Sequence, residues 1–162
     1  MLIAHLPAGY LLSKAWPRKG RVLTVAALIG AVFPDLDPLW QNFIDHGWFH
    51  HHEYWVHIPA FWAMIGAVVF PALAWKARYA LPVATVFFAA IALHLLLDAL
   101  VGGISWLWPA TNELFVLVEI PLVRTHWIWD FLFHWTFLAE IAIWLVAAAL
   151  FFRNRSTRPL PA

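Results

Sequence analysis

The sequence predicts an all-α protein, a polytopic integral-membrane helical bundle of four to five transmembrane helices. Three observations support this fold class. The chain is 64% hydrophobic and 12% charged, and its mean hydropathy of +0.75 lies far outside the soluble globular norm. Its apolar runs are separated by short segments that contain basic residues or prolines. Twelve tryptophans suit a membrane–water boundary, where indole rings are enriched.

Composition also limits the domain organisation and the chemistry. The 162 residues are enough for one domain. We expect a single membrane-embedded helical domain over residues 1–152 and a short, basic, disordered cytoplasmic tail over residues 153–162. Ten Lys and Arg against nine Asp and Glu leave no basic face for nucleic acid. The chain has no cysteine, so any metal must be held by histidine and carboxylate.

The first two apolar runs differ in length and in how they end. Met1–Trp16 is apolar except for three residues. As a helix it would be roughly 21–24 Å long, which makes it either a short tilted span or a re-entrant segment. Its positive charges follow the apolar run, so it does not read as a signal peptide. Val22–Phe33 is the second helix, which Pro34 and Pro38 are expected to end or kink.

Three longer spans follow. They are predicted at Tyr54–Trp75, Leu81–Leu100 and His126–Phe152. A mixed loop, Ser105–Thr125, joins the last two, and its short apolar piece Leu114–Val118 is expected to lie in the membrane interface.

The basic residues indicate a topology. They cluster at Lys14–Arg21, Lys76–Arg78 and Arg153–Arg158, and the intervening loops carry only Arg124. By the positive-inside rule, the C-terminus is cytoplasmic and the loop over residues 41–53 is outside. If Met1–Trp16 spans the membrane, the N-terminus is outside and there are five helices. If it does not, there are four.

Ionisable residues gather in the stretch over residues 33–57. This stretch holds three of the five aspartates, five of the nine histidines and one of the four glutamates. Asp45, His46 and His50 are expected to be loop residues. The predicted topology brings ionisable residues of four helices to the same outer level: Asp35, Asp37, His57, His94, Asp98, His126, Asp130 and His134, with His5 added if the first segment spans.

Such residues are costly inside a bilayer, and they usually face a bundle interior, where they pair or bind something. His94 and Asp98 are four residues apart and share a helix face. His126, Asp130 and His134 repeat this spacing and would form a stripe along one helix. Taken alone, any one of these histidines is more simply interpreted as a hydrogen-bonded packing residue. Asp35 alone is more simply interpreted as a turn residue beside proline. Their co-location favours a polar metal site at the outer face.

Neutral imidazole and carboxylate ligands suit zinc, and they also suit manganese and iron. The candidates exceed the ligands of one tetrahedral ion. The sequence is therefore compatible with two ions, or with one ion whose ligands are oriented by neighbouring carboxylates.

The order of these motifs resembles the YdjM-like family of inner-membrane proteins, which are described as LexA-binding and as metal-dependent hydrolases. The resemblance covers nearly the whole chain. It rests on these matches: His5 with Gly9, F-P-D-L-D at Phe33–Asp37, the five-residue spacing of His52 and His57, H-L-L-L-D at His94–Asp98, Gly102 with Gly103, W-L-W-P at Trp106–Pro109, and Asp130 early in the last helix.

The resemblance implies a location in the inner membrane and a metal set made of His5, Asp35, Asp37, His52, His57, His94 and Asp98. His51 is the alternative to His52 within the triplet, and it forms a second tier with His126, Asp130 and His134. The chain departs from the family pattern at Glu53, where the family has arginine, and at Val56, where it has threonine. Arg124, the only basic residue on the outer side, is the expected replacement for substrate binding.

The function that this pattern favours is a metal-dependent hydrolase. A carboxylate that is not a ligand would act as general base, with Asp37 as first choice and Glu53 as second. A site at the membrane interface predicts an amphipathic substrate, such as a membrane lipid or a lipid-linked phosphate or ester. No pattern in the sequence indicates an oligomeric state.

Three alternatives stay open. The protein could bind metal without catalysis, for sensing, transfer or structure. The LexA-binding description implies an interaction protein, although the cytoplasmic turns offer little surface. A transporter is the third alternative, but the cytoplasmic halves of the helices are almost free of polar residues.

Overall fold

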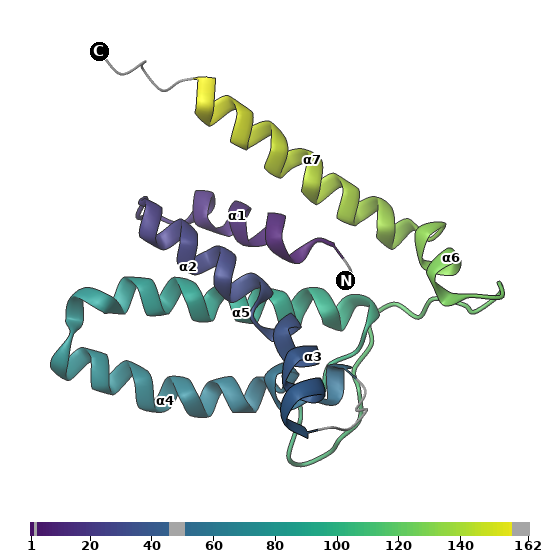
Figure 1. Ribbon diagram of the computed structural model, residues 1–162, viewed down its shortest axis with the longest axis horizontal. Coiled ribbons are helices and arrows are strands. Elements are labelled where there is room, and N and C mark those ends of the chain that lie inside the picture. The colour runs from purple at the N-terminus through teal and green to yellow at the C-terminus, as the bar shows by residue number, and fades with distance from the viewer. Residues whose placement is uncertain (2, 46–50, 157–162) are drawn as a thin grey trace.

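The computed structural model describes residue 1, residues 3–45 and residues 51–156, and every regular element in these ranges is helical (Figure 1). An isolated antiparallel bridge joins Ile104 to Phe115. This confirms the all-α class. In chain order the α-helices are α1 (His5–Ala15), α2 (Arg21–Val32), α3 (Asp37–Trp40), α4 (Pro59–Lys76), α5 (Leu81–Val101), α6 (Trp127–Leu132) and α7 (Trp135–Ser156), and a π-helix, Gln41–Asp45, follows α3.

Three helical segments are long and apolar enough to cross a membrane: Pro59–Lys76, Arg78–Val101 and Trp135–Arg155. A fourth span results if Arg21–Val32 and Pro34–Ile44, which are bent by 57°, count as one. The prediction of four to five transmembrane helices therefore agrees with the structure when the bent pair is counted as one span, which gives four spans. Helix α1 has 11 residues and is roughly 16 Å long, short of the bilayer core of about 30 Å.

The bend after α2 arises at Pro34, as the prolines predicted. Pro34 has no amide hydrogen to continue the helix, so α2 ends at Val32 and a 3-10 turn covers Pro34–Leu36. The amide of Leu36 donates to the carbonyl of Phe33 at 3.2 Å. Asp35 and Asp37 therefore lie at the bend.

Helix α5 is central to the bundle. Figure 1 shows it between α4 and α2, with α1 against α2, and α7 packs on α1. Small residues bring α2 close to α5: a Cβ added at Gly30 would lie 2.5 Å from the carbonyl oxygen of Phe87. This close approach brings the bend after α2 near the second half of α5.

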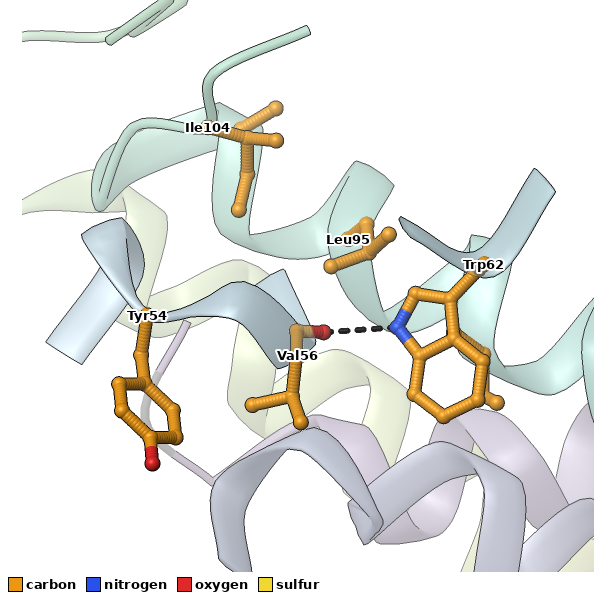
Figure 2. Close-up of a cluster of buried hydrophobic side chains, with 7 residues drawn as sticks. Tyr54, Val56, Trp62, Leu95 and Ile104 are labelled. Atoms are coloured by element: carbon orange, nitrogen blue, oxygen red, sulfur yellow. Dashed lines mark hydrogen bonds between the residues drawn. The ribbon is translucent and has the colours of Figure 1, made fainter. Parts of the chain in front are cut away.

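An apolar cluster joins α4 to α5 and to the turns that precede α4. It contains Tyr54, Val56, Trp62, Leu95 and Ile104 (Figure 2). The indole nitrogen of Trp62 donates to the carbonyl of Val56 at 2.7 Å. This contact holds the 3-10 turn Trp55–His57, which precedes α4, against the first turns of that helix.

The apolar piece predicted at Leu114–Val118 returns to the end of α5. The amides of Leu117 and Val118 donate to the carbonyls of Ala99 and Leu100 at 2.9 and 2.8 Å. The last carbonyls of a helix have no intrahelical hydrogen-bond partners. This segment supplies donors for two of them. The last turn of α5 is fixed in this way.

Two predicted boundaries were wrong. The third span begins at Pro59, because Trp55–His57 forms a 3-10 turn. The last span is not one helix from His126, because α6 ends at Leu132 and α7 begins at Trp135. Helix α7 also continues to Ser156, into the tail expected at residues 153–162. Residues 157–162 lie outside the described part of the chain.

Candidate metal centre

Helix α5 carries the centre of the site. His94 and Asp98 lie one helical turn apart and share a face. Both are buried, with exposed fractions of 0% and 1%. The Nε2 atom of His94 lies 3.0 Å from Oδ2 of Asp98. The face predicted from the spacing is therefore turned into the bundle.

Other elements bring further ligand atoms to this face, in two groups. The His5 group contains His5, Asp35, His94 and Asp98, and the His52 group contains His52, His57 and Asp98. Within each group, one ligand atom from every residue lies within 4.8 Å of the others. Among the described residues, only Asp98 belongs to both groups.

The two oxygens of Asp98 face different histidines. Oδ1 lies 3.1 Å from Nε2 of His5. Oδ2 lies 3.0 Å from Nε2 of His94, 3.7 Å from Nε2 of His52 and 3.8 Å from Nε2 of His57. The amino group of Met1 also lies 2.6 Å from Oδ1. Asp98 is therefore the carboxylate around which both groups are arranged.

Backbone carbonyls orient two of the histidines. Nδ1 of His94 donates to the carbonyl of Ala31 at 2.7 Å, and Nδ1 of His52 donates to the carbonyl of Gly102 at 2.7 Å. A carbonyl only accepts, so the proton of each neutral ring is on Nδ1 and the lone pair is on Nε2. Metal-binding histidines are commonly oriented in this manner.

The groups fit a cation. Oδ2 of Asp98 is buried without a hydrogen bond of good geometry, although Nε2 of His94 lies 3.0 Å away. The tautomer of His94 explains this, because two acceptors face each other and a positive charge between them would relieve the repulsion. Nε2 of His94 also lies 3.4 Å from Nε2 of His57. These two histidines belong to different groups, so this distance shows that the two groups adjoin each other.

The two residues predicted as general bases lie outside the two groups and differ in burial. Asp37, with an exposed fraction of 2%, begins α3 but lies outside both groups. Glu53 is exposed and also lies outside them. His51 begins a 3-10 turn, and its side chain lies outside the described part of the structure. The roles predicted for these residues remain predictions.

The stripe predicted for His126, Asp130 and His134 was wrong, because the chain breaks between α6 and α7. His126 caps the start of α6, where its Nδ1 accepts from the amide of Ile128. His134 lies in the break, with Nδ1 3.0 Å from Oγ1 of Thr136. None of the three belongs to either group of the described residues.

Arg124 is paired with Asp130 in this structure. Its Nη1 lies 3.1 Å from Oδ1 of Asp130, and the backbone amides of Val123 and Arg124 donate to the same carboxylate. Burial raises the pKa of Asp130, but these hydrogen bonds outweigh burial and hold the pKa below its usual range. Half of the Arg124 side chain is exposed, and its predicted contact with substrate remains a prediction.

One buried carboxylate was missed by the sequence reasoning. Glu140 lies within α7 and has an exposed fraction of 0%. It accepts a hydrogen bond from the amide of Ile3 at 2.6 Å. The available signal was its position as the only acidic residue between Trp135 and Phe152, since carboxylates inside membrane spans are usually functional.

Spanning helices around a buried histidine–aspartate cluster define an integral-membrane protein whose cluster could hold a metal ion. The model of the YdjM inner membrane protein family matches residues 1–158. The chain belongs to this family, which confirms the resemblance given by the order of its motifs. No curated protein and no solved structure matches the chain.

Proposed function

We propose that this protein is an integral-membrane, metal-dependent hydrolase. Its substrate would be a lipid or a lipid-linked phosphate or ester at the external face of the membrane that the protein spans. The observation that carries the proposal is the position of Asp98 between the His5 group and the His52 group. One carboxylate facing two sets of ligands is the arrangement expected for two divalent ions. Zinc is the ion that this set of imidazoles and carboxylates favours.

Bound metal would lower the pKa of a bound water to roughly 7 and polarise the scissile group. The chain must then supply a base, and we assign this role to Asp37. It is buried at the bend that also carries Asp35, whereas Glu53 is exposed. Asp35 and His52 are the most exposed residues of the two groups, with side-chain exposed fractions of 36% and 14%. Substrate would approach on their side.

Apolar hollows beside α5 support a lipid substrate. One, of about 510 Å³, lies between α4 and α5, and a second, of about 700 Å³, lies between α5 and the loop around Phe115. They share Leu96 and Trp106. Binding sites for apolar ligands are concave surfaces of this size lined by hydrophobic side chains.

The proposed orientation follows from the two ends of the bundle. The α1–α2 and α4–α5 turns lie at one end (Figure 1). These turns and the helix ends beside them carry six basic residues: Lys14, Arg18, Lys19, Arg21, Lys76 and Arg78. The last turn of α5, with Asp98, lies at the other end (Figure 1). A reporter fused after Pro161 should be cytoplasmic, and one inserted near Gly47 should be external. The reverse pattern would refute an outward-facing site.

Chelator treatment is expected to abolish hydrolysis, and added zinc should restore it, because the proposed chemistry depends on bound metal. The assay uses protein purified in detergent and a panel of phospholipids, polyprenyl phosphates and lipid esters. Turnover that persists after the metal has been removed would contradict the proposal.

The burial of the site favours a second candidate, a protein that binds metal without catalysis. His57, His94 and Asp98 are almost completely buried, and closed sites are typical of structural metals. Stoichiometric metal without turnover on any substrate of the panel would support this candidate.

A further inference from the structure

Two polar side chains of α7 hold the backbone of one residue near the N-terminus. Oε2 of Glu140 accepts from the amide of Ile3 at 2.6 Å, and Nε1 of Trp144 donates to the carbonyl of Ile3 at 2.9 Å. Glu140 and Trp144 are four residues apart, so they project from the same face of α7. Both backbone polar groups of Ile3 are thereby bound to one helix.

The burial of Glu140 makes this contact significant. A carboxylate without exposure to water, in a helix that spans a membrane, is costly unless hydrogen bonds satisfy it. A sequence that needed only an apolar helix would have leucine or alanine at this position.

Ile3 precedes the metal-ligand candidate His5 by two residues. Helix α1 begins at His5, and its N-cap residue, Ala4, provides no side-chain cap. The start of α1 therefore has no side-chain cap among the described residues. His5 is held by three other contacts. Its Nε2 donates to the carbonyl of Met1 at 2.8 Å and lies 3.1 Å from Oδ1 of Asp98, and its ring stacks on His94 with centroids 3.8 Å apart.

We infer that Glu140 and Trp144 are positioning residues for the His5 group, acting through the peptide groups of Ile3. This inference rests on the proposed metal centre. Helix α7 thereby has a role in the site, although none of its described residues belongs to the His5 group or to the His52 group. The His52 group, which lacks His5, should not depend on α7.

The test compares metal content and backbone protection in Glu140→Ala, Glu140→Gln and Trp144→Phe. We expect Glu140→Ala to lower bound zinc from about two to about one ion per chain and to increase hydrogen–deuterium exchange at the amides of residues 3–5. Glu140→Gln keeps an acceptor for the amide of Ile3 and should retain both properties. Trp144→Phe should give an intermediate result. Trp135→Phe is the matched control, because Trp135 lies in α7 and is exposed.

A double-mutant cycle separates positioning from a general loss of structure. If Glu140 acts through His5, then His5→Ala combined with Glu140→Ala should bind as much zinc as His5→Ala alone. A further loss of zinc in the double variant would overturn the inference. Full zinc content and unchanged exchange in Glu140→Ala would overturn it while leaving the proposed function intact. Wild-type protein that binds no zinc would overturn both.

Discussion

Replacing Asp98 by alanine is expected to abolish metal binding in both groups at once. The variant removes Oδ1, which faces His5, and Oδ2, which faces His94. Without this carboxylate, the His52 group has no negative charge to offset the desolvation of a dication, and the His5 group keeps only that of Asp35. The affinity loss should exceed the about 10- to 100-fold that removal of a ligand-orienting partner causes. Metal analysis of purified protein measures the effect, and hydrolysis should disappear with the metal.

The control for this variant must account for folding. Asp98 also accepts a hydrogen bond from the amino group of Met1, so its loss leaves a buried positive charge without its partner. Asp98→Asn keeps the volume and one acceptor oxygen, and it should stay folded by circular dichroism while losing metal. Glu119→Ala, at an exposed carboxylate, should keep all of its metal. A folded Asp98→Ala protein with full metal content would refute the shared centre.

Replacing Gly102 by alanine is expected to remove His52 from its group while leaving the fold intact. A Cβ at Gly102 would lie 1.9 Å from Cε1 and 2.6 Å from Nδ1 of the His52 ring. Gly102 has φ −91° and ψ −20°, which alanine adopts without strain. The ring must therefore move, and it loses its hydrogen bond to the carbonyl of Gly102.

Zinc titration of Gly102→Ala should show one site weakened by about 10- to 100-fold and the other unchanged. Gly20→Ala is the matched control, because a Cβ there meets nothing within 4 Å. A thermal unfolding temperature near that of wild type would show that the effect is local. Two unchanged zinc sites in Gly102→Ala would contradict the placement of His52.

Much of the site followed from local sequence patterns. Helix α5 was predicted at Leu81–Leu100 and is observed at Leu81–Val101, and its four-residue spacing fixed the face shared by His94 and Asp98. The prolines placed Asp35 at a bend. The family resemblance added His52, and it added His5 without the condition, set by the topology, that the first segment spans the membrane.

Other parts of the site depend on contacts that no local pattern encodes. Asp37 is two residues from Asp35, but a tight turn sends such neighbours in different directions, and it lies outside both groups. The break at Phe133 divides a periodic stretch that reads as one helix. Glu140 binds a backbone amide 137 residues away, and a backbone amide has no sequence signature.

The shared carboxylate sets the order in which the site is completed during biosynthesis. Both groups include Asp98, so a nascent chain of 97 residues contains neither group in full, although the other members have already been made: His5, Asp35, His52, His57 and His94. Chains emerge at about 5–20 residues per second. Early helices therefore enter the bilayer with incomplete ligand sets. Both groups are completed together when the last turn of α5 is synthesised.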